Sequence, residues 1–302
     1  MNKINDAGDY SPTSFKLGIS IAASWAWGIS LGISFSILQT KGLIPFIIWG
    51  IFNILALPIY GIYIRKYPNY LQFTKNNLVK ITMLIIQIFA IWINTKIMYD
   101  FISNPYIATV IALIVITTTL KYKFEFSLKS DQWQYLIMIL GLLIVVLSGN
   151  YVNKNIILGN GINWALWGGI CLLTGPFLDS QQFQRASKSK SIKPFIIGSI
   201  SFAVYLILVL LAYIYNSGSI LLTTIVIAVA TSTIDSSVAS LQYLTSDFKA
   251  GFISIAALIT WPVFMTNTAA EIWSWYASGR VFIVIPLIIL GVYYEKTKKR
   301  RI

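Results

Sequence analysis

Two aspartates, Asp179 and Asp235, lie inside otherwise apolar stretches, and each has polar neighbours in the chain. Asp179 is followed by Ser-Gln-Gln-Phe-Gln, and Asp235 stands within Thr-Ser-Thr-Ile-Asp-Ser-Ser. A carboxylate inside a membrane helix costs about 2.5–3.5 kcal/mol on insertion scales, so it is expected to face a cavity or a partner. Carboxylates and hydroxyls in such a run supply the hard oxygen ligands that a small cation such as sodium requires.

Simpler explanations exist for both aspartates. Asp179 could lie at the cytoplasmic mouth of a helix beside Arg185, and Asp235 could belong to an interhelical hydrogen-bond network. Two cations inside apolar stretches also have alternatives: Lys96 is close enough to a helix end to reach the interface, whereas Arg280 is deep enough to be the counter-charge of a carboxylate or a substrate. An aromatic set in the last apolar stretch is expected to form an interfacial belt or to cap a cavity: Trp273, Trp275 and Tyr276.

The elements that must position these residues are transmembrane helices. Of the 302 residues, 57% are hydrophobic and 11% are charged, whereas soluble domains have about half and about a quarter. The apolar residues occur in blocks of about 20, the length with which an α-helix crosses about 30 Å of hydrocarbon. Ten spans are predicted: Phe15–Leu38, Leu43–Ile64, Leu78–Phe101, Tyr106–Leu120, Gln132–Tyr151, Asn163–Ala186, Pro194–Asn216, Ile220–Leu244, Ala250–Thr266 and Glu271–Tyr294.

The positions of the 23 lysines and arginines predict the orientation. Nineteen of them lie before the first span, after the even-numbered spans or in the tail, and only Lys41 and Lys154 lie on the opposite side. By the positive-inside rule both termini are cytoplasmic, and the net charge of +13 reflects topology rather than nucleic-acid binding. The polar segment Met1–Ser14 does not resemble a cleavable signal, so we expect an integral protein of the plasma membrane.

Several activities lack the residues they need. The chain has no histidine, which argues against histidine-dependent acid–base chemistry and against haem or zinc sites. Its single cysteine, Cys171, cannot form an intramolecular disulfide, and no phosphate-binding or dinucleotide-binding glycine motif is present. We therefore predict that the chain is not an enzyme and uses no cofactor other than a coupling ion.

The ten predicted spans divide into two sets of five around a turn-rich connection with two glycines. Because an odd number of spans reverses the side of the membrane, the two halves would have opposite topology, as in the inverted repeats of many transporters. The expected divisions are a cytoplasmic segment at 1–14, a first repeat at 15–151, an external connection at 152–162, a second repeat at 163–294 and a basic cytoplasmic tail at 295–302.

In this transporter design, discontinuous helices near the bilayer midplane form the binding site. The sixth span carries Thr174-Gly175-Pro176 in its middle, where proline removes a hydrogen-bond donor and glycine costs about 1 kcal/mol of helix propensity. The first span has Gly28 beside Trp25 and Trp27, which is a weaker signal. We therefore predict broken first and sixth helices.

Three parts of the chain resemble the sodium/solute symporter family, whose members carry sugars, proline or urea. Asp179-Ser-Gln-Gln-Phe-Gln-Arg185, followed by Ala186-Ser-Lys188, resembles the D/N-Q-x-x-x-Q-R-x-x-x-A-K stretch on the family's sixth core helix. Ser232-Thr-Ile-Asp-Ser236 is similar to the S-T/S-L-x-S element on the eighth. Ala22-Ala-Ser-Trp-Ala-Trp-Gly28 and the basic Arg65-Lys-Tyr-Pro-Asn69 connection resemble the urea-carrier branch.

This resemblance implies a sodium site. It would consist of the hydroxyls of Ser232 and Thr233 together with main-chain carbonyls near Ala22, Trp25 and Val229.

Asp235 and Ser236 are further candidates for cation binding. Asp235 stands where the family often has a hydroxyl, so its charge could strengthen cation binding, create a second cation site or let a proton replace sodium. The resemblance also implies a substrate cavity at the broken helices, around Trp25, Trp27, Gly175, Asp179 and Gln182.

Together these features predict an all-α polytopic membrane protein that acts as a secondary active transporter. It would move a small polar solute together with sodium by alternating access, and the solute could be urea, a sugar or an amino acid. Two alternatives remain open: a proton-coupled carrier that uses Asp235, and a non-transporting sensor or interaction protein on a carrier scaffold. The expected partners are the solute and the lipid bilayer, with no nucleic acid.

Overall fold

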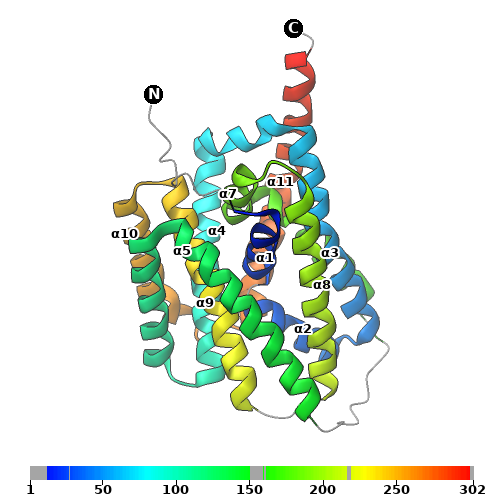
Figure 1. Ribbon diagram of the computed structural model, residues 1–302, viewed down its shortest axis with the longest axis vertical. Coiled ribbons are helices and arrows are strands. Elements are labelled where there is room, and N and C mark those ends of the chain that lie inside the picture. The colour runs from blue at the N-terminus through cyan, green and yellow to red at the C-terminus, as the bar shows by residue number, and fades with distance from the viewer. Residues whose placement is uncertain (1–11, 27, 150–158, 160, 216–218, 300–302) are drawn as a thin grey trace.

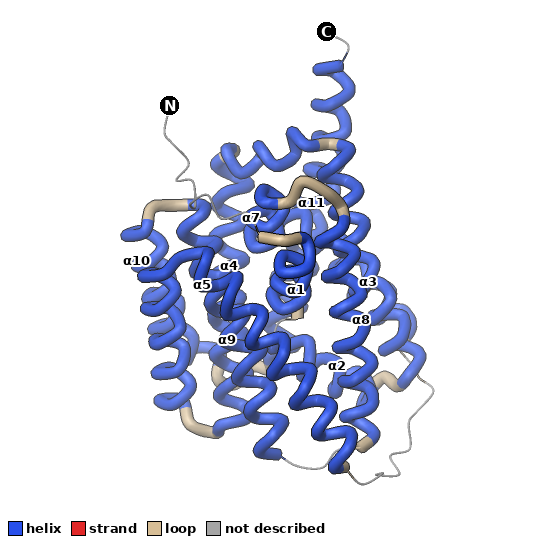
Figure 2. Tube along the Cα trace, viewed as in Figure 1, coloured by secondary structure: helices blue, strands red, loops and turns tan. Residues whose placement is uncertain are grey.

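The computed structural model describes residues 12–26, 28–149, 159, 161–215 and 219–299. This part of the chain is helical and contains no β-strand (Figure 2). Its elements, with η denoting a 3₁₀ helix, are α1 (Ser14–Trp25), α2 (Gly28–Thr40), α3 (Leu43–Lys66), η1 (Pro68–Lys75), α4 (Asn77–Ile102), α5 (Pro105–Ser148), α6 (Ile162–Thr174), η2 (Gly175–Leu178), α7 (Ser180–Lys188), α8 (Lys193–Ile214), α9 (Ser219–Leu244), α10 (Asp247–Thr260), η3 (Trp261–Phe264) and α11 (Ala269–Lys299).

Both predicted helix breaks are present. In the first predicted span, α1 ends at Trp25, and it meets the Ser30–Thr40 part of α2 at an angle of 55°. In the sixth, α6 ends at Thr174, and η2 follows with a proline at its second position. Asp179 then has an extended backbone, with φ −96° and ψ 111°, before α7 begins. Proline lacks the amide that would continue the α-helical hydrogen bonds, which explains the second break.

The fourth and fifth predicted spans are two helices that meet at a sharp kink, and α5 is the label of both (Figure 1); the predicted basic connection between them is shorter than expected. Between Leu120 and Gln132, α5 departs from helical geometry only at Lys123, whose φ is 59° and ψ is −157°. The residues after this kink face the protein interior at every third or fourth position, and Phe124, Leu128 and Asp131 are buried there. This correction places Asp131 inside a helix rather than in a loop.

Among the described residues, seven helices are long and apolar enough to cross a membrane, and the bent pair of α1 and α2 passes the same test as one span. The segment Ile162–Leu178 is a shorter apolar helix. The outward side of α3 carries large apolar residues that are 41–55% exposed and recur every three or four positions: Ile44, Ile47, Ile51, Leu55, Ile59 and Ile62. Hydrocarbon is the solvent that suits such a stripe, so the chain is a polytopic all-α membrane protein.

The short helix α1 lies in the middle of the bundle, with α5, α8 and α9 around it (Figure 1). Glycines let α1 and α8 approach closely, since a Cβ atom at Gly18 would lie 2.6 Å from Ile197 Cγ2 and one at Gly198 would lie 2.7 Å from Ile21 Cγ2. The most extensive contact in the bundle is between α5 and α9. The broken end of α1 is therefore held inside the protein, away from lipid.

Candidate functional site

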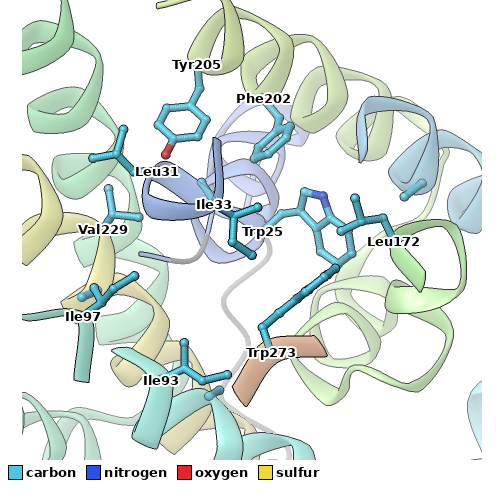
Figure 3. Close-up of a cluster of buried hydrophobic side chains, with 14 of the residues drawn as sticks. Trp25, Leu31, Ile33, Ile93, Ile97, Leu172, Phe202, Tyr205, Val229 and Trp273 are labelled. Atoms are coloured by element: carbon cyan, nitrogen blue, oxygen red, sulfur yellow. The ribbon is translucent and has the colours of Figure 1, made fainter. Parts of the chain in front are cut away.

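A cavity lies beside the two helix breaks. It is lined by residues of α1, α2, α3, α6 and α11 and by the residue that precedes α7: Trp25, Ser30, Asn53, Leu172, Asp179, Trp273, Tyr276 and Arg280. Its volume accessible to water is about 30 Å³. The cavity is therefore a narrow slot in this conformation. Figure 3 shows the rings of Trp25 and Trp273 beside Leu172.

The position of the Trp25 ring depends on both breaks. Its Nε1 donates a hydrogen bond to Asn53 Oδ1 at 2.6 Å, which fixes the ring against α3. A Cβ atom at Gly175 would lie 2.6 Å from Trp25 Cη2 and 3.1 Å from Arg280 Nη2. Only glycine leaves room for these two side chains against η2. Three residues predicted around the substrate thus come together in space, namely Trp25, Gly175 and Asp179.

Arg280 supplies a positive charge to the cavity from α11. Its Nη2 donates to the carbonyl oxygen of Cys171 at 2.9 Å, and its guanidinium carbon lies 5.5 Å from the centroid of the Tyr276 ring. The Nε atom has no hydrogen-bond partner within the described part of the chain. Arg280 is buried, with only 5% of its surface exposed.

Asp179 supplies a negative charge from the second break. Its Oδ1 caps α7 by accepting from the Gln181 amide at 3.0 Å, and it also accepts from Gln87 Nε2 at 3.3 Å. Its Oδ2 has no hydrogen-bond partner among the residues described. Within this same part of the chain, neither Asp179 nor Arg280 forms an ion pair shorter than 4.0 Å. The cavity therefore contains two buried charges that do not neutralise each other directly.

A second group of buried polar residues connects α1, α5, α7 and α9, and we call it the polar cluster. Its centre is an ion pair between Asp131 Oδ2 and Arg185 Nη2, 2.7 Å apart, in which both side chains are fully buried. Asp131 also accepts hydrogen bonds from Ser20 on α1 and from Ser232 on α9, the latter at 2.9 Å. Arg185 donates in addition to Ser20 and Ser236, each at 2.9 Å. Four helices are joined through one ion pair.

Asp235 belongs to the same cluster and faces α5. Its Oδ1 accepts from Ser127 at 3.0 Å and from Ser236 at 3.2 Å, and its Oδ2 accepts from Ser130. The Ser236 hydroxyl is also 3.4 Å from Asp131 Oδ1, so it connects the two carboxylates. The expectation of an interhelical hydrogen-bond network around Asp235 agrees with this arrangement, and the network contains two acids for one arginine.

The residues that the family resemblance implies for sodium belong to α1 and α9, two helices that contact each other. Ser232 donates its hydroxyl proton to Asp131, and Thr233 Oγ1 donates to the carbonyl oxygen of Val229 at 3.2 Å. The carbonyl oxygen of Ala22 accepts from the Ala26 amide at 2.9 Å, where α1 ends. A hydroxyl that donates a hydrogen bond still has lone pairs on its oxygen that can bind a cation. The hydroxyl oxygens of Ser232 and Thr233 thus keep lone pairs that are free to accept.

The remaining predicted site residues take other positions. Trp27 lies outside the described residues. Gln182 is not among the residues that line the cavity, and its Nε2 donates to Ser24 Oγ at 3.2 Å. Of the aromatic set in α11, Trp273 and Tyr276 line the cavity, whereas Trp275 is 53% exposed as an interfacial residue would be.

Sequence reasoning did not identify Asp131, although it is the centre of the polar cluster. Apolar block length assigned Asp131 to the connection before the fifth span, among Lys121, Lys123 and Lys129. The available signal was the helical spacing of Ser127, Ser130, Asp131 and Gln134, which places polar side chains on one side of a helix.

No family model matches the chain, and no curated protein matches its sequence. Among solved structures, the chain is similar to a Na⁺-coupled sialic acid symporter in a substrate-bound, outward-open state. The TM-score is 0.60 at 16% sequence identity, and the match covers 93% of this chain and 79% of that one. At this identity the similarity shows a shared fold, and that fold is one which a secondary transporter uses.

Proposed function

We propose that this protein is a sodium-coupled symporter for a small polar solute and a member of the sodium/solute symporter family. The observation that carries the proposal is the meeting of two broken helices at one buried cavity that contains Asp179 and Arg280. Unwound helix ends near the middle of a bundle are where such transporters bind their ligands. The shared fold with a Na⁺-coupled symporter supports the same conclusion.

In this proposal, sodium binds between α1 and α9. The carbonyls of Ala22, Trp25 and Val229 and the hydroxyls of Ser232 and Thr233 are its ligands. Five neutral oxygens suit a monovalent hard cation. A negative charge is nearby because Ser232 donates to Asp131 at 2.9 Å, and this carboxylate orients the serine oxygen.

Asp235 and Ser236 extend the proposed cation site towards α5.

Proton coupling is a second candidate function, and the polar cluster favours it specifically. Asp131 and Asp235 share Ser236 as a hydrogen-bond partner while Arg185 neutralises one charge, so a single proton or a single sodium ion would complete the charge balance.

The solute site in this proposal is the cavity, with Trp25, Gly175 and Asp179 in its walls and Gln182 behind it. Trp27 stays a prediction for this site. The narrow slot opens to one side of the membrane and then the other when the bundle rocks against the remaining helices. The protein would lie in the plasma membrane with both termini in the cytoplasm, as the distribution of lysine and arginine predicts.

Uptake into proteoliposomes tests the coupling ion. An inward sodium gradient at equal pH should drive accumulation of a labelled solute, and a pH gradient without sodium should not. The opposite result would support proton coupling. Solute binding without accumulation under either gradient would instead identify the non-transporting sensor.

Thermal unfolding of the purified protein tests the sodium site. Sodium should raise the unfolding temperature of the wild type more than potassium does, because a ligand that binds only the folded state stabilises it. Ser232→Ala and Thr233→Ala should each remove this sodium effect. Ser254→Ala is the matched control, since Ser254 is buried and donates to the Ala250 carbonyl at 2.8 Å on α10. A wild-type sodium response in both test variants would refute the site.

A further inference from the structure

Arg280 has a buried hydrogen-bond donor that no described residue accepts. Arg280 is 5% exposed in a membrane-spanning helix, where an arginine normally pairs with a carboxylate. Its contacts here are a carbonyl oxygen and the ring of Tyr276, and Nε is left without a partner in the described residues. A planar guanidinium with free donors is the group that binds a carboxylate with two parallel hydrogen bonds.

Asp179 has a buried acceptor oxygen to which no described residue donates. Asp179 is 1% exposed, and its two bonds from Gln181 and Gln87 both go to Oδ1. Its Oδ2 is buried and has no partner in the part of the chain described. A buried carboxylate oxygen without a donor is unfavourable unless a ligand provides one.

The protein keeps these two charges apart rather than pairing them. Both line the same slot, yet no ion pair within 4.0 Å joins them among the described residues. Trp25, which is fixed by its 2.6 Å bond to Asn53 and packs against η2 at Gly175, forms a wall of this slot. The slot therefore has one positive and one negative side chain in its lining.

We infer that the transported solute is a small zwitterion, whose carboxylate binds Arg280 and whose cationic nitrogen donates to Asp179 Oδ2. The rings of Trp25, Trp273 and Tyr276 would surround the short carbon skeleton between the two charges. A neutral solute such as urea or a sugar leaves both buried charges without a complement, and a simple carboxylate leaves Asp179 unsatisfied. This inference rests on the proposed transport function and specifies the solute of that same cavity.

Competition among simple probes tests the inference on the wild type. Binding is followed by the fluorescence of the tryptophans that line the cavity, with sodium present, for proline, glycine betaine, acetate, ethanolamine, urea and glucose. Proline should bind at least about tenfold more tightly than acetate or ethanolamine, because each of these leaves one buried charge unsatisfied. Glycine betaine should be weaker than proline, since its nitrogen has no proton to donate.

Two charge-removing variants assign the two ends. In Asp179→Asn the advantage of proline over acetate should fall to within about threefold, and in Arg280→Gln the advantage of proline over ethanolamine should fall in the same way. Arg280→Lys should restore part of the carboxylate preference. The matched control is Lys96→Gln, which removes a buried cation outside the cavity, where Lys96 pairs with Asp100, and should leave the order of the probes unchanged.

Tighter binding of urea or glucose than of proline by the wild type would overturn the inference. This result needs no variant, so the inference can be refuted even if Arg280→Gln does not fold. An unchanged order of probes in both charge-removing variants would overturn it as well. Failure of the proposed function is distinguishable, because selective zwitterion binding without gradient-driven accumulation would refute transport and leave the ligand assignment standing.

Discussion

The ion pair between Arg185 and Asp131 allows a quantitative test of the polar cluster. Its atoms are 2.7 Å apart and both side chains are fully buried. Removing one partner of a buried pair costs about 3–5 kcal/mol because the other charge is left uncompensated. In Asp131→Asn the arginine keeps three neutral acceptors, the hydroxyls of Ser20 and Ser236 and the carbonyl of Gln181, so we expect a loss of about 3 kcal/mol.

Arg185→Gln should cost a similar amount, since Asp131 would then depend on serine hydroxyls alone. The double variant removes both charges and leaves two amides that can bond to each other and to the serines. We expect it to lose only about 2 kcal/mol, which corresponds to a coupling free energy of about 4 kcal/mol.

Equilibrium unfolding of the four proteins in one detergent measures this coupling, and the control is the exposed pair of Lys123 and Asp247. That pair is 2.9 Å apart, but its side chains are 55% and 51% exposed. The matching cycle with Lys123→Gln and Asp247→Asn should therefore give less than about 1 kcal/mol. Losses in the Arg185 and Asp131 cycle that add within about 0.5 kcal/mol would show that the two groups do not stabilise the fold as a pair, and the reasoning would be refuted.

Four further substitutions have expected outcomes. Gly175→Ala should cost about 1–3 kcal/mol of unfolding free energy and weaken solute binding, because the new Cβ would lie 2.6 Å from Trp25, whereas Gly279→Ala, with no atom within 4 Å of its Cβ, should be neutral or stabilising. Lys123→Gly should raise the unfolding free energy by about 1 kcal/mol, since glycine removes the strain of φ 59° at the kink of α5. Burial raises the pKa of Tyr70 in η1, so its stabilising effect is complete below the unfolded pKa of about 10 and is lost above it. Stability measured from pH 7 to 11 should therefore fall above about pH 10, and less steeply in Tyr70→Phe.

Features that depend on neighbouring residues in the chain were predictable. The apolar blocks predict the helices because a span must be about 20 apolar residues long whatever it packs against. The break after Thr174 follows from glycine and proline in sequence, since the missing amide acts within one turn. Arg280 and Asp179 stood out because a charge inside an apolar block needs a special environment wherever it lies.

The pairing of those charges was not predictable from one sequence. Asp131 was not predicted because block length describes hydropathy only, whereas the helix that follows the kink at Lys123 begins before the apolar block of the fifth span. The sequence places Arg185 close to Asp179 in the chain, which favours a contact between these two residues. Arg185 instead binds Asp131, 54 positions away. Contacts of this range depend on how α5, α7 and α9 pack, and hydropathy does not specify that packing.

The helix α7 connects the two proposed binding sites. Asp179, which caps its first turn, lines the cavity, and Arg185, about 9 Å further along the helix, belongs to the polar cluster. If solute and sodium bind at these two places, a displacement of α7 by one ligand changes the site of the other, and linkage requires both affinities to change by the same factor. Arg185→Gln should therefore reduce the effect of sodium on solute affinity more than it reduces solute affinity without sodium. An unchanged sodium effect in a folded Arg185→Gln protein would mean that the two sites are coupled by another route.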